Sequence, residues 1–478
     1  MIKKSTIYFA VLALTIGAHV NTILAQTWTI GNTTLTESDV VTGLDVPWEI
    51  LWGPDDFIWA TTRSGEVLHI EPSTGNYTTI LDLTDVVPDG GSGEPGLLGM
   101  VLHPDWTNTP KVFVVYNYMI GNNIRERLAS YDWNGTNLVN ETFLLNNIPG
   151  NWIHNGSRLV ITPDQKILMS TGDTGDGGDS SQDFAALNGK VLRINLDGSI
   201  PSDNPVLNTG DLPGYTYSWG HRNIQGLCIG PDGTIYSSEH GQNNNDEFNI
   251  IEPGRNYGWP NVEGVCNTNS EQTFCAANNV KEPIRTWTPC VAVNGIEYYN
   301  HPAIPEWNNC ILMGVMGGLS GANGNNDRIS VLHLSADGLT IDSEDQFFTS
   351  LNQRFRDVCV NPYTGALYVA LNGSSYPGNG PNKIKEFRNL AFNSVENLTA
   401  TQDINLYPNP ATNHIQIAGS STLVGKKIQI FSANGDLAKE FILQSTLETI
   451  DISGFAQGAY WLKTSSELGT VTATFLKQ

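Results

Sequence analysis

One short pattern occurs six times and limits the folds open to this chain. Each copy is a turn containing Pro with Asp, Gly or Asn, followed by a short strand rich in β-branched and aromatic residues. Repeats of this kind, spaced by about 40–50 residues or more, indicate a propeller, so six copies within residues 27–390 predict a six-bladed β-propeller with a central channel. A β-sandwich followed by a barrel is the alternative. The copies are "GPDDFIWATT" (53–62), "HPDWTNTPKVFVVYNY" (103–118), "TPDQKILMSTGD" (162–173), "GPDGTIYSSEHG" (230–241), "NPYTGALYVALNG" (361–373) and a weaker "IPEWNNCILMGVMGG" (304–318).

The first 25 residues have the features of a secretory signal peptide. Lys3 and Lys4 precede an apolar run, and the small residue Ala25 stands before Gln26. Such a segment is removed on export and is too short to be a membrane span. No other stretch approaches the roughly 18 apolar residues of a transmembrane helix. We therefore expect residues 1–25 to be cleaved and the mature chain to be exported and soluble, without a transmembrane segment.

The charge balance excludes some partners. With 48 acidic against 25 basic residues, the net charge of −23 argues against nucleic acid and anionic membrane surfaces as partners. It is compatible with cation binding or simply with solubility outside the cell.

Six cysteines lie between Cys228 and Cys359, which is compatible with disulfides in an oxidising compartment. Two pairs could bridge, Cys266 with Cys275 across a polar loop or Cys290 with Cys310 across a hairpin. No CxxC occurs, so a zinc or redox motif is not expected.

A second, smaller unit follows the repeats. After a polar join at residues 391–401, the segment 402–478 alternates as strands do and includes an Asn-Gly hairpin in "KKIQIFSANGDLAKEF", which predicts a small β-sandwich. "LYPNP" and the ending "GAYWLK" resemble the type A C-terminal sorting domain of the type IX secretion system. The resemblance implies export across the outer membrane to the cell surface or the medium, with the secretion machinery as a partner. An adhesive sandwich is the alternative.

One pair of residues has the chemistry of a general base. His154 precedes a strand and Asp173 ends the next one, so a hairpin over "RLVITPDQKILMSTGD" would bring the imidazole and the carboxylate together. A carboxylate on one ring nitrogen fixes the tautomer and leaves the other nitrogen as a base. For His221 and His240 a structural role is the simpler interpretation, as it is for most lone histidines.

Two further groups of residues suggest binding sites: paired arginines for an anionic ligand, and clustered oxygen atoms for a cation. Arg354 and Arg356 are two apart in "NQRFRDV", so on a strand they present a double guanidinium fork that suits a carboxylated or phosphorylated ligand. Arg222 lies beside Asn223. In "EHGQNNNDEFNIIEPGRNYGWP", Asp246 and Glu247 with loop carbonyls predict a calcium site better than "TGDTGDGGDS", which matches neither the EF-hand nor the nonapeptide pattern.

Several ordered motifs over residues 40–390 resemble the glucose/sorbosone dehydrogenase family. They are "EPGLLGMVLHPDW", "HNGSRLVITPDQKILMSTGD", "LNGKVLRINLDGSIPSDNP", "GHRNIQGLCIGPDG", "SEHGQNNNDEFNIIEPGRNYGWP" and "RFRDV". The resemblance implies a six-bladed propeller that holds pyrroloquinoline quinone (PQQ) and calcium in its central cleft. It also implies oxidation of the anomeric hydroxyl of an aldose to a lactone, with transfer of electrons to an external acceptor.

The same resemblance implies residue roles by motif position. His154 corresponds to the catalytic base and Asp173 to the carboxylate that orients it. The other correspondences are Arg222 and Asn223 beside the reactive carbonyl of the quinone, Arg354 and Arg356 at its carboxylates, Gly241 and Gln242 at its calcium, Glu247 and Tyr257 at a second, structural calcium, and Glu94 on the substrate side.

The sequence departs from the family pattern at two positions. No Lys occurs between Lys281 and Lys383, where the family has a cofactor-binding lysine; Gly317 stands near that place, with Arg328 as the nearby cation. Ile153 stands where the glucose enzyme has an acidic residue, so glucose itself is not implied. Two other functions stay open, a surface propeller that binds glycans or a protein, and a calcium-dependent lactonase.

Overall fold

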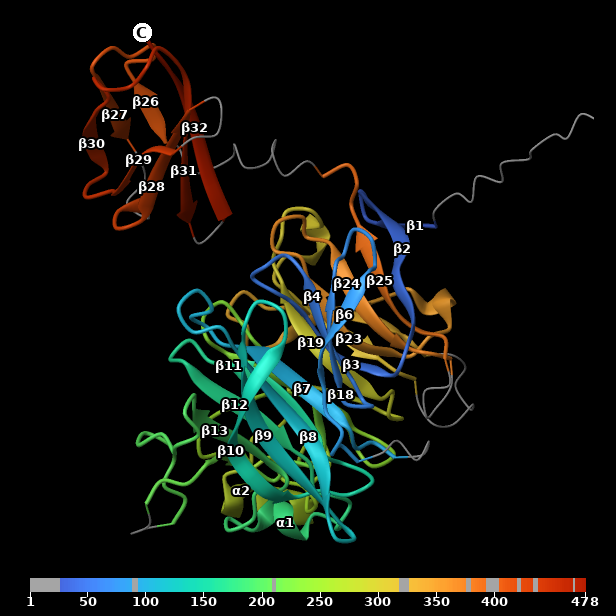
Figure 1. Ribbon diagram of the computed structural model, residues 1–478. Helices are drawn as coiled ribbons and strands as arrows, with labels where there is room; N and C mark the ends of the chain where they lie inside the picture. The colour runs from blue at the N-terminus through green and yellow to red at the C-terminus, as the bar shows by residue number, and fades with distance from the viewer. Residues whose placement is uncertain are drawn as a thin grey trace, which may run out of the picture.

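A computed structural model describes residues 26–87, 93–208, 212–317, 326–374, 380–392, 404–418, 423–432, 437–466 and 469–478. The predicted signal peptide, residues 1–25, positions 393–401 of the predicted join and the first two positions of the predicted C-terminal unit, 402–403, lie outside the described residues. Strands are the main regular secondary structure of the described chain (Figure 1).

The predicted six-bladed propeller is confirmed. Six antiparallel sheets each contribute an innermost strand, and every innermost strand contacts those of the two neighbouring blades, so that β3, β7, β11, β15, β19 and β23 close into a ring. The first five blades are β3 (Pro47–Trp52), β4 (Ile58–Thr62), β5 (Glu66–Ile70), β6 (Tyr77–Asp82); β7 (Leu97–Leu102), β8 (Lys111–Ile120), β9 (Asn123–Trp133), β10 (Leu138–Pro149); β11 (Gly156–Ile161), β12 (Lys166–Thr171), β13 (Lys190–Asn195), β14 (Thr216–Trp219); β15 (Ile224–Ile229), β16 (Ile235–Glu239), β17 (Asp246–Ile250), β18 (Arg285–Trp287); and β19 (Val293–Tyr299), β20 (Cys310–Val315), β21 (Arg328–Leu334), β22 (Ile341–Phe347).

The sixth blade joins the two ends of the propeller sequence. Strands β23 (Phe355–Val360), β24 (Leu367–Asn372) and β25 (Asn382–Arg388) are completed by β2 (Thr33–Leu44), with β1 (Thr27–Ile30) at the outer edge. β2 pairs with β25 from Thr36 opposite Arg388 to Leu44 opposite Asn382. Because hydrogen bonds across this seam close the ring, the blade leaves few strand edges open.

The repeated pattern corresponds to the same strand in every blade. Its apolar segments are β4, β8, β12, β16, β20 and β24, each the second strand of its sheet, and its turns connect the first strand to the second. These second strands are buried on both sides between neighbouring blades. Burial on both faces explains why the repeats are almost continuously apolar.

A buried ion-pair cluster lies inside the ring of innermost strands. The Arg158 guanidinium on β11 donates to Glu49 Oε1 on β3 at 2.7 Å and to Asp357 Oδ1 on β23 at 2.9 Å. The guanidinium also lies 4.2 Å from the ring centre of Trp48. The cluster connects three blades and fixes Trp48 at the inner end of the central cavity.

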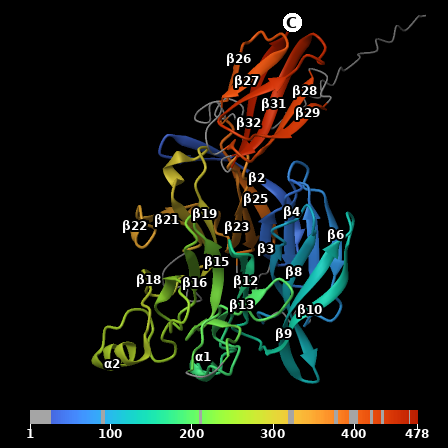
Figure 2. The ribbon, with the colours of Figure 1, turned by 90° about the vertical axis from the view of Figure 1, so that its left-hand side faces the viewer.

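The C-terminal unit is the predicted small β-sandwich. It has two sheets, and buried residues such as Ile415, Ile430 and Leu462 form a hydrophobic core of its own. Both sheets are visible in Figure 2. The strands are β26 (Asn405–Tyr407), β27 (His414–Ala418) and β30 (Leu447–Asp451) in one sheet, and β28 (Lys427–Ser432), β29 (Leu437–Ile442), β31 (Gly458–Ser466) and β32 (Gly469–Lys477) in the other.

Helices are few in the described chain and lie in connections between strands. α1 (Asp179–Gln182) connects β12 to β13, and α2 (Asn269–Asn278) lies in the long connection between β17 and β18. Two short 3₁₀ helices, Pro305–Trp307 and Thr349–Leu351, complete the set. Within the described ranges, no helix is long and apolar enough to cross a membrane.

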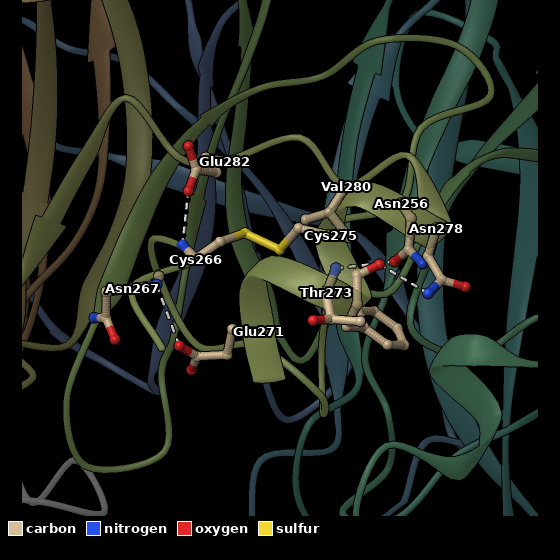
Figure 3. Close-up of a disulfide and its surroundings, with 12 residues drawn as sticks. Asn256, Cys266, Asn267, Glu271, Thr273, Cys275, Asn278, Val280 and Glu282 are labelled. Atoms are coloured by element: carbon tan, nitrogen blue, oxygen red, sulfur yellow. Dashed lines mark hydrogen bonds between the residues drawn. A yellow bond between two sulfur atoms is a disulfide. The ribbon is translucent and has the colours of Figure 1, made fainter. Parts of the chain in front are cut away.

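Of the two cysteine pairs that could bridge, Cys266–Cys275 forms a disulfide and Cys290–Cys310 does not. Cys266, which precedes α2, is bonded to Cys275 within α2, and the Cys266 N–H donates to Glu282 Oε1 at 2.6 Å (Figure 3). Cys290 and Cys310 are free thiols. In the β19–β20 hairpin Cys310 pairs with Tyr299 at one end, whereas Cys290 precedes Val293 at the other end, so the hairpin register separates them.

Candidate active site

The six blades share one large cavity, at the end of the channel where the second strands finish. Its volume is about 640 Å³, within the usual range for small-molecule sites. Residues from every blade line it, from Trp48 in the first to Asn372 in the sixth. Nine of the site residues predicted from the sequence line this cavity: Glu94, His154, Arg222, Asn223, Gly241, Gln242, Asp246, Arg354 and Arg356.

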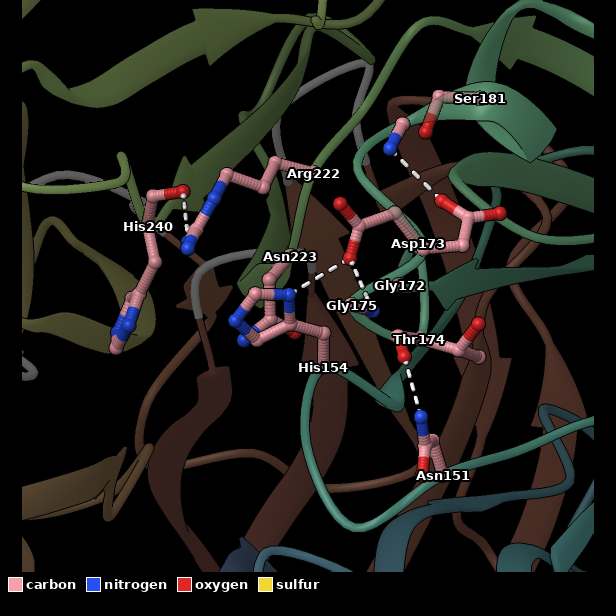
Figure 4. Close-up of polar contacts among 12 residues, drawn as sticks. Asn151, His154, Gly172, Asp173, Thr174, Gly175, Ser181, Arg222, Asn223 and His240 are labelled. Atoms are coloured by element: carbon pink, nitrogen blue, oxygen red, sulfur yellow. Dashed lines mark hydrogen bonds and ion pairs between the residues drawn. The ribbon is translucent and has the colours of Figure 1, made fainter.

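The hairpin places His154 against Asp173. β11 and β12 pair with Gly156 opposite Thr171, so the residues just outside the hairpin meet, and His154 Nδ1 lies 2.7 Å from Asp173 Oδ1 (Figure 4). The other carboxylate oxygen accepts from Trp259 Nε1 at 2.8 Å, and Oδ1 also accepts from the Gly175 N–H at 2.8 Å. An ionised carboxylate accepts only, so His154 Nδ1 carries the proton and Nε2 keeps its lone pair.

The backbone of His154 is held in an unusual conformation. Its φ of 55° lies in the left-handed region, which costs free energy for a residue with a side chain. Glu94 Oε2 accepts the His154 N–H at 2.7 Å, and the His154 carbonyl accepts from the Thr174 N–H at 3.2 Å. These contacts from two neighbouring segments fix the imidazole at the cavity wall.

The environment of Asp173 gives its stability contribution a defined pH dependence. Burial opposes ionisation, but hydrogen bonds from His154, Gly175 and Trp259 outweigh it and hold the pKa of Asp173 below its ordinary value. Because the folded-state pKa is the lower one, the stabilisation is present above the unfolded value of about 3.9 and is lost as pH falls through the folded pKa.

We therefore expect Asp173→Asn to lower the free energy of unfolding by roughly 1–3 kcal/mol at pH 7, the usual cost of disturbing a buried hydrogen-bonded group. The difference from wild type should narrow as the pH is lowered below about 4. Urea unfolding of both proteins at pH 7 and pH 3 measures this difference in the free energy of unfolding. A difference that grows at acid pH would contradict the lowered pKa of Asp173.

Arg222 and Asn223 lie beside this pair. The Arg222 guanidinium donates to the His240 carbonyl at 3.2 Å and lies 5.3 Å from the Trp259 ring centre. Among the described residues its buried Nε has no hydrogen-bond partner. A buried donor of this kind is costly unless a ligand supplies an acceptor.

The opposite wall of the cavity is positively charged. Arg356 donates to Asn372 Oδ1 at 2.9 Å and to Asn294 Oδ1 at 2.7 Å, and Arg354 donates to the Met316 carbonyl at 3.3 Å. Burial and the charges of Arg354, Arg63 and Arg158 lower the pKa of Arg356 to about 9. In a chain of net charge −23, this concentration of positive charge fits an anionic ligand.

Asp246 and Glu247 do not form one cation site as predicted. They alternate along β17, so Asp246 faces the large cavity and Glu247 a small second one. The Asp246 carboxylate accepts N–H groups of Gly241 at 2.9 Å and of Val291 and Ala292 at 2.7 Å each. It therefore folds the 240–246 loop against the 290–292 segment.

The small second cavity contains both residues expected at a structural calcium. Glu247 and Tyr257 line it together with Glu239 and Glu263. Burial and the nearby Glu239 raise the pKa of Glu247 to about 8. Among the described residues, no three His, Cys, Asp or Glu side chains are placed to ligate one metal ion together. Carbonyl groups would have to supply most ligands.

Arg328 does not take the place of the family lysine. Its guanidinium donates to Glu344 Oε1 at 3.3 Å and to the Asn326 carbonyl at 2.9 Å. Asn326 lines the cavity, but Arg328 is not one of the lining residues. Gly317 does line the cavity. Arg63 is a further cationic residue in the lining, and the sequence reasoning missed it.

The repeats contain a signal that would have found Arg63. Residues one or two positions after a second strand reach the site, since His240 and Gly317 line the cavity after β16 and β20, and Asp173 contacts His154 after β12. Arg63 follows β4 in the same way. By contrast, Trp259 reaches Asp173 from the long β17–β18 connection, and no repeat position predicts it. The lining residues not singled out include Trp48, Arg63, Gln225, Asn155 and Asn372.

The fold and the site define a class, the six-bladed propeller whose central cavity has a His–Asp pair facing a wall of arginines. The sequence profile of the Glucose / Sorbosone dehydrogenase family matches residues 44–376, and that of a secretion system C-terminal sorting domain matches residues 405–478. The chain therefore belongs to the glucose/sorbosone dehydrogenase family and ends in a sorting domain.

Named relatives are similar over the propeller. Quinoprotein glucose dehydrogenase B of Acinetobacter calcoaceticus is 36% identical over 252 residues, 47% of this chain and about half (52%) of that protein. An aldose sugar dehydrogenase of Escherichia coli is 28% identical over 70% of this chain and 88% of its own length. The PQQ-bound aldose sugar dehydrogenase of Streptomyces coelicolor superposes with a TM-score of 0.60 at 29% identity, covering 74% of this chain and 98% of that one.

Proposed function

We propose that this protein is an exported quinoprotein that oxidises the anomeric hydroxyl of an aldose to a lactone, with PQQ and calcium as cofactors. The observation that carries the proposal is the His154–Asp173 pair, which faces an arginine-lined cavity shared by all six blades. The family and its named relatives support the same reaction class.

The cavity fits the quinone by its chemistry. PQQ carries several carboxylates, and Arg354 and Arg356 offer charge-assisted hydrogen bonds to such groups. Arg63 adds a third guanidinium to the same lining. On the other side, the buried Nε of Arg222 has no acceptor among the described residues, and a quinone carbonyl would supply one.

Each residue around the proposed substrate position has a distinct proposed role. When bound, PQQ supplies the two-electron oxidation. His154 Nε2, free because Nδ1 is held by Asp173, takes the proton of the sugar hydroxyl. Arg222 and Asn223 orient acceptor groups beside it, and Glu94, in the same wall, faces the substrate. The buried Asp173 stabilises the imidazolium that forms.

Calcium has two proposed places. Among the described residues, the carbonyl oxygens of Gly241 and Gln242 accept no hydrogen bond, so they are available to an ion that accompanies the quinone. Glu247 with the backbone near Tyr257 would hold the structural ion, which would relieve the repulsion between Glu247 and Glu239.

Export completes the proposal. We assign residues 1–25 to a removed signal peptide, 26–390 to the catalytic propeller, 391–401 to a join and 402–478 to the unit that the type IX secretion machinery reads. The protein would then act at the cell surface or in the medium, where an external acceptor reoxidises it.

Titration of the purified protein with PQQ, with calcium and with EDTA, tests this function. We expect saturable binding that needs calcium, followed by sugar-dependent reduction of a dye. The absorbance of the bound quinone measures binding, and the rate of dye reduction with a series of aldoses measures turnover. Failure to bind PQQ would point to the glycan-binding alternative, and calcium-dependent ester hydrolysis without PQQ would point to the lactonase.

A further inference from the structure

Two large apolar side chains are exposed immediately before His154. Trp152 is 48% exposed and Ile153 is 40% exposed. Scattered exposed apolar residues are ordinary, but a pair of them at the edge of a polar cavity is informative.

The segment that carries them is firmly held. Asn151 Nδ2 donates to the Thr174 carbonyl at 2.7 Å, and Asn155 Nδ2 donates to the Asn151 carbonyl at 2.8 Å. From the neighbouring blade, the Glu94 N–H donates to the Trp152 carbonyl at 2.9 Å. The indole is therefore presented from a fixed backbone, which lowers the entropy cost of binding a ligand on it.

The position of this pair is continuous with the cavity. Ile153 lines it, and a Cβ built on Gly175 would lie 2.8 Å from Ile153 Cδ1. Trp152 lies against the segment that carries Glu94, since a Cβ on Gly93 would lie 2.9 Å from the Trp152 ring. The indole thus stands on the rim between the second and third blades, beside two residues of the proposed reaction centre.

The reaction geometry places a second sugar unit outside the cavity. An aldose must present its C1 hydroxyl to His154 Nε2, and in a pyranose ring C4 lies at the opposite end from C1. A cavity of about 640 Å³ that also takes a tricyclic quinone has room for one sugar ring. A second ring joined through O4 must lie outside it, over the rim.

We propose that Trp152, with Ile153, forms a subsite for the second sugar unit, so that the preferred substrates are the reducing ends of oligosaccharides. The inference rests on the proposed function and names its substrate class. The C–H face of a pyranose packs on the indole while its hydroxyl edge stays in water. Binding energy gained there, remote from C1, raises turnover of longer substrates over monosaccharides.

The test compares wild type with Trp152→Ala on glucose, cellobiose and cellotriose, using the PQQ-loaded protein. We expect kcat/KM for the two oligosaccharides to fall about tenfold, and for glucose by less than about twofold. Trp152→Phe should keep most of the preference. Tyr77→Ala is the matched control, because Tyr77 is 49% exposed on an outer strand of the first blade.

A second measurement does not depend on turnover. The indole N–H signal of Trp152, assigned by its loss in Trp152→Phe, should shift on addition of cellotriose and stay in place on addition of glucose. Equal losses on all three sugars would show that Trp152 only supports His154, and an unmoved signal would overturn the subsite. If no variant oxidises any sugar with PQQ, the proposed function fails, while this titration still decides whether the rim binds a saccharide.

Discussion

We expect His154→Gln to lower kcat for sugar oxidation by about 10²–10⁴-fold, the usual contribution of a positioned general base. Glutamine can still donate to Asp173, so the wall of the cavity keeps its shape, but it has no basic nitrogen where Nε2 of the imidazole stands. Dye-linked turnover with saturating PQQ and calcium measures the change.

The control for this variant is binding. The affinity for PQQ and the free energy of unfolding should stay close to wild type, since His154 is placed by its own backbone contacts with Glu94 and Thr174. Full residual activity would remove His154 from the mechanism. Loss of PQQ binding together with activity would make it a structural residue.

Replacing Arg356 should have the second large effect. Arg356→Met removes one charge-assisted partner of a carboxylated ligand, which is worth roughly 1.5–3 kcal/mol, so the Kd for PQQ should rise about 10- to 100-fold. The KM for sugar at saturating PQQ should change little. Quenching of protein fluorescence by PQQ measures the Kd.

Arg285→Met is the matched control. Arg285 is half exposed on β18, and it pairs with Glu344 on β22, the outer strand of the next blade. Its Kd for PQQ should equal that of wild type. The Kd of Arg356→Lys for PQQ should lie between those of wild type and Arg356→Met, since an ammonium keeps the charge but not the planar fork. Equal affinity in all variants would show that the arginine wall does not hold the quinone.

The parts of the site that could be predicted are those set by strand periodicity. The His154–Asp173 contact follows from the register of one tight hairpin, and the repeats gave the number of blades because each copy is one second strand. The same periodicity contradicts the shared cation site, because Asp246 and Glu247 alternate on β17.

Other features depend on how distant segments meet. Trp259 contacts Asp173 across 86 positions of sequence, through a connection without a repeated pattern. The prediction of a Cys290–Cys310 disulfide is wrong, because closeness in sequence does not show at which end of a hairpin each residue lies, and these two cysteines lie at opposite ends. Arg328 lies near the expected position along the chain, yet its guanidinium pairs with Glu344 and it is not one of the residues that line the cavity.

The course of β25 determines how a tethered molecule would be oriented. The strand begins at Asn382, whose partner Asn372 lines the cavity, and ends at Arg388 opposite Thr36, about 20 Å farther along the blade. The chain thus leaves the propeller on the side away from the cavity mouth. A molecule held to an outer surface by its C-terminal end would face the medium with its open side, and sugars and electron carriers could reach it without passing the anchor.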